Sequence, residues 1–305
     1  MAITDTQDTD ADRRIFDTLK RPDYLYHFTS IEVLALILKY QKLRFRRLDF
    51  VDDPIEARTS DFGLQGKYIL VSCWTNQADE NLLQWSMYGK MFQGVRIRIR
   101  SDAPFDKPYE ISAGDVPFGQ LSEGTYFSSI EAHHLINDRY MIPPGDLFNH
   151  PCFEVKYTTD NERLVPKVIS KDGTFGPDAF GYWQKDGPTV LLSEIGKYKN
   201  SVWKEQSEWR FMVPVFPMTR EIFTKMSAKE TCLEGAKLIF DAMEREQDPG
   251  LEYLDIPLKR SHIDQMEITL GPLTTAADRI IVESLCDSFA PKATIAESSL
   301  AGKVR

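Results

Sequence analysis

The sequence predicts an α+β fold with mostly antiparallel sheets flanked by helices. Strand-like and helix-like segments follow one another irregularly over 305 residues, without the strand–helix–strand rhythm of a parallel sheet. The clearest strand signal lies at residues 94–100, where apolar and basic residues alternate with a period of two. This period predicts that one set of side chains is buried and the other faces solvent or ligand: Val95, Ile97 and Ile99 against Arg96, Arg98 and Arg100.

Short elements are expected through the first third of the chain. Thr29 or Ser30 can cap a helix that begins at Ile31, and Glu32 adds a favourable charge near the N-terminus of that helix. Asp52-Asp53-Pro54 is typical of a turn. The expected order is a tail and lead-in helix at 1–20, a strand at 24–28, the capped helix, strands at 43–46 and 67–74, and a helix at 80–90.

The segment 101–151 is rich in Gly, Pro and Asp, and is expected to be an insertion with a helix near 128–140. It interrupts a single domain spanning 21–290, which a C-terminal tail at 291–305 follows. The later elements are expected as strands at 153–157, 208–215, 253–258 and 265–270, and as helices at 179–198, 220–226, 233–244 and 274–286.

Composition indicates a soluble cytoplasmic protein. The formal net charge is -9 and the pI about 5.2, so general electrostatic attraction to nucleic acid or to an anionic membrane is absent. No apolar run approaches the ~20 residues of a membrane span, and the polar N-terminus is not a signal peptide. The four cysteines form no close pair, and no Gly-rich dinucleotide fingerprint follows a strand.

Two polar clusters predict a cleft for a ribose-containing ligand. Gln206 and Glu208 stand two residues apart before an apolar run, and residues i and i+2 of an extended segment point to the same side. His27 ends an early strand and precedes two hydroxyl residues, Thr29 and Ser30. Imidazole, hydroxyl and carboxylate groups are suitable partners for sugar hydroxyls.

Each of these residues also has a structural explanation. His27 can be a core or capping residue, and Glu208 can pair with Arg210 on a strand surface. Tyr88, in the helix expected at 80–90, could stack on a planar ring or pack beneath the sheet. A third hypothesis concerns the carboxylates Asp52, Asp53 and Glu56, which could hold a divalent metal in a hydrolase. Acids in such a turn more often make turn hydrogen bonds or pair with nearby arginines.

The chain resembles a bacterial domain family of unknown function over about residues 22–290. The matching motifs are Tyr-His-Phe-Thr-Ser from Tyr26, Asp-Asp-Pro-x-Glu from Asp52, Ser-Cys-Trp from Ser72 with Trp-x-x-Tyr from Trp85, and Gln-x-Glu-Trp-Arg from Gln206. The family usually has Asn where this chain has Asp52, and Glu where it has Gln206.

That family is distantly similar to ADP-ribosyltransferases, and the similarity implies an ADP-ribosyltransferase-like fold that uses NAD without a metal. By this resemblance His27 would hold the ribose or nicotinamide, Tyr88 would stack on nicotinamide, and Gln206 would orient the acceptor. Glu208 would bind the ribose 2′-hydroxyl and stabilise an oxocarbenium-like transition state. It also implies a transferase or NAD glycohydrolase acting as a toxin or antiviral defence effector, with the acceptor open.

The chemistry supplies two further expectations. The NAD diphosphate needs cations, which Arg46, Arg47 or Arg210 can provide. The same fold could also serve as an inactive nucleotide-binding or sensing module.

Overall fold

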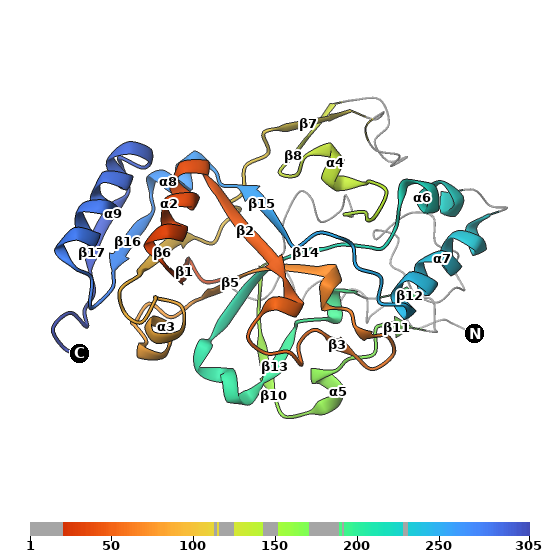
Figure 1. Cartoon of the computed structure of the whole chain (residues 1–305), viewed down its shortest axis with the longest axis horizontal. Helices are drawn as coiled ribbons and strands as arrows, with labels where there is room; N and C mark the ends of the chain where they lie inside the picture. The colour runs from red at the N-terminus through yellow and green to blue at the C-terminus, as the bar shows by residue number, and fades with distance from the viewer. Residues whose placement is uncertain are drawn as a thin grey trace, which may run out of the picture.

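The computed structural model describes residues 21–112, 115, 125–142, 152–170, 189–190, 192–227 and 231–305, so the expected tail and lead-in helix at 1–20 lie outside it. The described chain is a mixed α+β protein built around a large, mostly antiparallel sheet that helices flank (Figure 1). The predicted α+β class is therefore confirmed.

Nine described strands form the large sheet. All of its pairings are antiparallel except that of β16 with β17. The path of neighbouring strands is β15 (Tyr253–Pro257), β2 (Lys42–Arg47), β5 (Ile69–Thr75), β1 (Tyr24–Thr29), β6 (Val95–Arg100), β16 (Glu267–Leu270) and β17 (Thr294–Glu297). A branch leaves β5 through β14 (Glu208–Pro214) to β9 (Cys152–Glu154).

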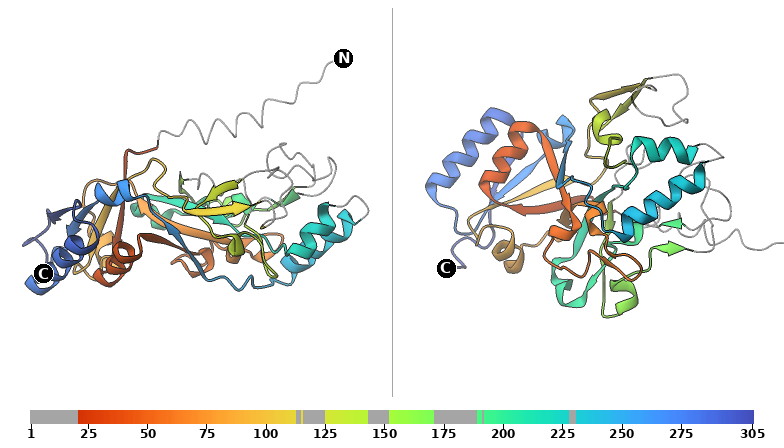
Figure 2. Two further views of the ribbon diagram at one scale, coloured as in Figure 1. Left: turned by 90° about the horizontal axis from the view of Figure 1, so that it is seen from above. Right: turned by 45° about the vertical axis from the view of Figure 1, so that its right-hand side comes forward.

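Two helix pairs lie at opposite ends of the molecule (Figures 1 and 2). One pair is α2 (Ile31–Tyr40) with α9 (Ala276–Phe289), and the other is α6 (Arg220–Ser227) with α7 (Cys232–Glu244). Ser30 caps α2 by accepting a hydrogen bond from the Val33 amide at 3.3 Å, as its sequence position predicts. The shorter helices are α3 (Leu82–Met87), α4 (Ala132–Leu135), α5 (Asn161–Leu164) and α8 (Arg260–Asp264).

Small two-stranded sheets complete the fold. A parallel pair, β10 (Lys156–Thr158) and β13 (Tyr198–Asn200), contributes two residues to the candidate site described below. The remaining pairs are antiparallel: β3 (Arg58–Thr59) with β4 (Gly63–Leu64), β7 (Tyr109–Ser112) with β8 (Thr125–Ser128), and β11 (Ile169–Ser170) with β12 (Thr189–Val190).

The central strand β5 has three partners, and this opens the sheet. β14 pairs with β5 along the whole of 69–75, so β1 and β2 share the other edge. On that edge β2 pairs only at Leu70 and Val71, and β1 only at Thr75. Residues 72–74 therefore have no ladder partner there among the described strands. We call the opening between β1 and β2 along these residues the fork.

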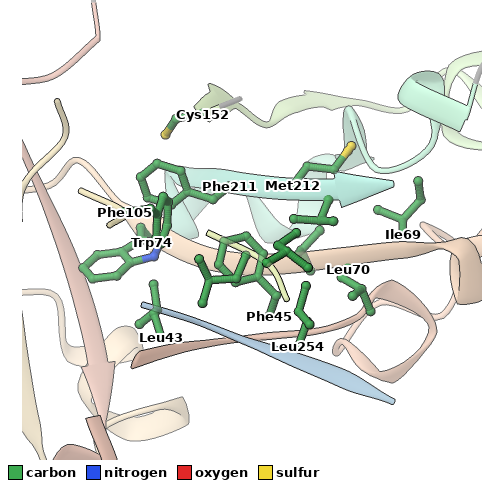
Figure 3. Packing of buried hydrophobic residues seen from close by; sticks show 14 of the residues in the cluster. Leu43, Phe45, Ile69, Leu70, Trp74, Phe105, Cys152, Phe211, Met212 and Leu254 are labelled. Atoms are coloured by element: carbon green, nitrogen blue, oxygen red, sulfur yellow. The ribbon is translucent and has the colours of Figure 1, made fainter. Parts of the chain in front are cut away.

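Aromatic side chains fill the core on one side of the central strands. Figure 3 shows Trp74, Phe105 and Phe211 in mutual contact, with the Phe105 and Phe211 rings 5.0 Å apart and at 87°. Trp74 meets Phe211 edge-on at 6.4 Å. Such edge-to-face packing adds about 0.5–1.5 kcal/mol per pair beyond burial alone. The core thus fixes β5, whose residues 72–74 lie along the fork, against β14 on its other edge.

The prediction for the alternating strand is confirmed for its apolar face and wrong for one arginine. Ile97 and Ile99 are each 1% exposed, whereas Arg96 is also buried, at 7% exposure. Its guanidinium lies 4.8 Å from the Tyr26 ring centroid and donates to the Ala78 carbonyl at 2.8 Å. The alternation predicts that this guanidinium is hydrated. Aromatic rings and a backbone carbonyl oxygen take the place of water around it.

Three other expectations differ from the structure. The helix expected over 128–140 is limited to α4, because β8 and an irregular turn occupy the rest. Of the helix expected at 179–198, residues 189–190 form β12 and residue 198 begins β13, while 179–188 lie outside the described residues. The expected C-terminal tail contains β17, which pairs parallel to β16 through Ile268 and Ile295.

No helix in the described ranges combines the length and apolar character needed to cross a membrane.

Candidate functional site

A cavity of about 340 Å³ lies over the fork, and it collects the four residues that sequence motifs singled out. His27 comes from β1, Tyr88 from the end of α3, and Gln206 and Glu208 from the start of β14. The other lining residues are Tyr26, Phe28, Arg44, Arg46, Phe50, Val51, Asp52, Val71, Ser72, Cys73, Trp74, Thr75, Gln84 and Lys199.

A larger cavity of about 510 Å³ exists elsewhere, lined by Lys42, Glu131 and Tyr253 among others. It contains none of the predicted residues. The buried Gln206 Oε1, which lacks a hydrogen-bond partner among the described residues, belongs to the cavity at the fork instead. We therefore take the fork as the candidate site.

His27 reaches the cavity through the fork rather than from the face that carries Glu208. The register pairs Tyr26 with Thr75 and Thr75 with Glu208, so strand alternation assigns His27 to the opposite side, with Trp74. The His27 and Trp74 ring centroids are 5.1 Å apart. In a continuous sheet this placement would separate His27 from Glu208, and only the opening of the strands brings both to one cavity.

The tautomer of His27 follows from its backbone contact. Its Nδ1 lies 2.9 Å from the Cys73 carbonyl oxygen, which can only accept, so Nδ1 carries the proton. Burial lowers the pKa of His27 below its usual value of 6.5. At neutral pH the imidazole is therefore uncharged, and Nε2 is an acceptor for a ligand hydroxyl or N–H group.

Gln206 and Glu208 reach the cavity by a turn, not by strand alternation. Gln206 ends a 3₁₀ helix (Ser201–Gln206), and Ser207 adopts a left-handed conformation with φ of 43° before β14 begins at Glu208. The expectation of one extended segment is thus wrong, although both residues line the cavity. The turn is held because Thr75 Oγ1 donates to the Ser207 carbonyl at 3.1 Å and Gln84 Nε2 donates to the Gln206 carbonyl at 2.9 Å.

Tyr88 connects two walls of the cavity. Its hydroxyl donates to Asp52 and accepts from Gln206 Nε2 at 2.7 Å. Burial and the Asp52 carboxylate both raise the pKa of Tyr88. The amide of Gln206 is oriented by this contact, because Nε2 faces Tyr88 and the buried Oε1 is left as a free acceptor.

Glu208 belongs to a ring of four buried charges, which we call the charge ring: Glu56, Lys199, Glu208 and Arg210. Arg210 Nε lies 2.5 Å from Glu208 Oε1, and Lys199 Nζ lies 3.1 Å from Glu208 Oε2. Glu56 closes the ring, with Oε1 3.1 Å from Lys199 Nζ and Oε2 against Arg210. All four side chains are at most 7% exposed, so water hardly screens the ring.

The charge ring sets the ionisation of Glu208. Burial alone would raise the pKa of this carboxyl, but Arg210 and Lys199 outweigh burial and lower the pKa to about 2. The Glu208 amide donates to the Tyr157 hydroxyl at 2.9 Å, which fixes the backbone as well. Burial and the nearby Glu208 carboxylate raise the pKa of the Cys73 thiol, which is therefore protonated at neutral pH.

Among the expected diphosphate contacts, only Arg46 lines the cavity. Arg47 is buried and pairs with Asp49 and Asp248, while the guanidinium of Arg210 is enclosed in the charge ring. Thr29 is buried at 6% exposure and Ser30 serves as the α2 cap, so neither reaches the ligand space. Four of the predicted binding residues, Thr29, Ser30, Arg47 and Arg210, thus have structural roles.

The carboxylates of the metal hypothesis have separate partners. Asp52 accepts from Tyr88, Asp53 Oδ1 accepts from the Ile55 amide at 3.0 Å, and Glu56 belongs to the charge ring. Across the described ranges, no three His, Cys, Asp or Glu side chains are grouped so that they could hold a metal. The geometry gives the hydrolase hypothesis no support.

Sequence reasoning missed Lys199 and Trp74 as cavity residues. Lys199 follows the helix expected at 179–198 and belongs to no sequence motif, so the sequence does not indicate its contact with Glu208. Trp74 ends the strand expected at 67–74 and belongs to the Ser-Cys-Trp motif, but neither feature predicts that it lines the cavity. No protein-family model, curated protein or solved structure matches this chain. The resemblance to ADP-ribosyltransferase-like proteins stays a prediction.

Proposed function

We propose that the cavity at the fork binds NAD and that the protein breaks the nicotinamide–ribose bond, as an ADP-ribosyltransferase or NAD glycohydrolase. The observation that carries the proposal is the meeting of His27, Tyr88, Gln206 and Glu208 around one cavity from separate parts of the chain. Its volume of about 340 Å³ is at the lower end of the about 300–1,000 Å³ typical of ligand pockets. It suits the nicotinamide–ribose half of the dinucleotide.

Glu208 has the properties that this chemistry requires. Breaking the bond builds positive charge on the ribose, and a fixed anion close to the sugar stabilises that charge. The charge ring keeps Glu208 ionised and holds each carboxylate oxygen from one side. A carboxylate offers about four acceptor positions, so at least one remains for the ribose 2′-hydroxyl.

The remaining lining groups suit an aromatic amide. Trp74 and Tyr88 offer flat apolar surfaces for the pyridine ring. Gln206 Oε1 is buried without a hydrogen-bond partner among the described residues, and a ligand N–H such as that of the carboxamide would satisfy it.

Arg46 supports binding of the diphosphate. It is exposed at the cavity wall, stacks over Phe50 at 5.1 Å, and has no ion pair with a described residue. Its neighbour Arg44 is already neutralised by two hydrogen bonds to Asp255, at 2.8 and 2.9 Å. Arg46 is therefore the cation with charge left for a phosphate group.

One observation favours a second candidate, a nucleotide-binding module without turnover. The two acids and two bases of the charge ring have a net charge of zero, so the cations neutralise part of the negative potential that Glu208 exerts in the cavity. Such a module would bind NAD and release no nicotinamide.

Nicotinamide release from NAD tests the proposal directly. Purified protein is incubated with NAD, with and without cell lysate as a source of acceptor, and nicotinamide is separated by chromatography. We expect release, and at least tenfold weaker use of NAD by Arg46→Ala. Arg100→Ala is the matched control, because Arg100 pairs with Asp102 on the surface. Binding without release identifies the sensing module, and absence of both removes the NAD proposal.

A further inference from the structure

The charge ring buries four charged side chains together, which costs hydration free energy. Each ion loses several kcal/mol of hydration on burial, and well-packed apolar residues are often as stable as a buried ion pair. The charge ring nevertheless draws on three separated segments: the 51–57 loop, β13 and β14. Its position against the candidate cavity indicates what the ring does.

The two cations approach different oxygens of Glu208. Arg210 contacts Oε1 from the same strand, and Lys199 contacts Oε2 from β13. This arrangement fixes the plane of the carboxylate, because rotation would break one contact or the other. Glu56 receives the same two cations at its own two oxygens, so Lys199 bridges both acids.

We propose that Lys199 and Glu56 are positioning residues, which hold the Glu208 carboxylate in one orientation and in its ionised form. Lys199 stabilises the negative charge at Oε2, and Glu56 offsets enough positive charge to leave Glu208 a net attraction for a developing cation. The role in catalysis rests on the proposed NAD chemistry. The effect on the ionisation of Glu208 does not.

The other titratable groups facing Glu208 cannot replace Lys199. Cys73 on β5 is a protonated thiol, and the phenols of Tyr157 and Tyr88 are neutral because burial raises the pKa of each. Loss of Lys199 therefore leaves Arg210 as the one cation in contact with the carboxylate among the described residues.

A charge-balanced double variant, Glu56→Gln/Lys199→Met, tests the inference. It removes one acid and one base, so the remaining Glu208–Arg210 pair stays neutral. The carboxyl carbons of glutamate are labelled with ¹³C and followed by NMR during a pH titration, with Glu208→Gln used to assign the Glu208 signal. Loss of Lys199 raises the titration midpoint of Glu208, and loss of Glu56 lowers it. Lys199 contacts the Glu208 carboxylate directly whereas Glu56 contacts only the two cations, so we expect a net rise of the midpoint.

Two comparisons complete the design. The exposed pair Glu221 and Lys225 on α6, 3.2 Å apart, gives the control double variant Glu221→Gln/Lys225→Met, which should leave the midpoint unchanged. Lys199→Gln, which keeps a hydrogen-bond donor, provides the same measurement if the double variant does not fold. An unchanged Glu208 midpoint overturns the inference.

The NMR result is independent of whether NAD is the substrate. If the wild type releases nicotinamide, the acid limb of the pH–rate profile should shift to higher pH in the variant, as the NMR midpoint does. A purely structural role for Lys199 would lower the melting temperature and leave the pH profile in place, which contradicts the inference. If the wild type releases none, the proposed function fails while the titration still decides the role of Lys199.

Discussion

Replacement of Glu208 by glutamine should destabilise the protein strongly, because it leaves two buried cations facing one acid. Glu208 is 5% exposed and contacts both Lys199 and Arg210. Breaking a buried ion pair by removing one partner costs about 3–5 kcal/mol. An exposed pairing with Arg210, the alternative explanation from sequence, would cost only ~0–1 kcal/mol.

The assay is urea unfolding of the wild type and Glu208→Gln at pH 7, with thermal melting on the same samples. For a chain of 305 residues, a loss of this size corresponds to a fall in melting temperature of roughly 5–8 °C. Glu205→Gln is the matched control, because its side chain is 63% exposed and lies 4.0 Å from Lys204. The double variant Glu208→Gln/Lys199→Met, which restores charge balance, should recover part of the loss. A single-variant loss below about 1 kcal/mol would refute the buried charge ring.

Two further predictions concern acid stability and backbone packing. The pKa of Glu208 is about 2 in the folded protein and 4.5 when unperturbed, so its contribution is complete above pH ~4.5 and is lost as pH falls toward 2. Urea unfolding between pH 6 and 3 should show this loss in the wild type and not in Glu208→Gln. Gly94→Ala should lower the unfolding free energy by at least about 1–3 kcal/mol, since the added Cβ would lie 2.2 Å from the Thr29 carbonyl oxygen. A melting temperature of Gly94→Ala equal to that of the wild type would contradict the prediction.

The fold class and the positions of many helices and strands were predictable, because both follow from the local periodicity of apolar residues. The alternation at 95–100 correctly predicts a buried apolar face. It fails for Arg96, because Tyr26 and the Ala78 carbonyl come from other segments and give the guanidinium a buried partner. The strand β17 was missed because it is stabilised by parallel pairing with β16, a long-range contact that composition does not show.

The candidate site was predictable only where local sequence motifs specify it. Motif positions identified Gln206 and Glu208, but the left-handed Ser207 that turns them together depends on contacts with β5 and α3. The fork depends on which residues of β5 pair with β1 and β2, and single-sequence patterns do not specify register between distant strands. Lys199 joins the site only through this tertiary arrangement.

The most direct test of the central claim is a crystal structure with an NAD analogue whose nicotinamide–ribose bond cannot be cleaved. We predict density for the analogue at the fork, with the ribose against Glu208, the ring against Trp74 and Tyr88, and the diphosphate at Arg46. Density in the cavity lined by Lys42 and Glu131, or none at saturating analogue, would contradict the assignment of the fork as the NAD site.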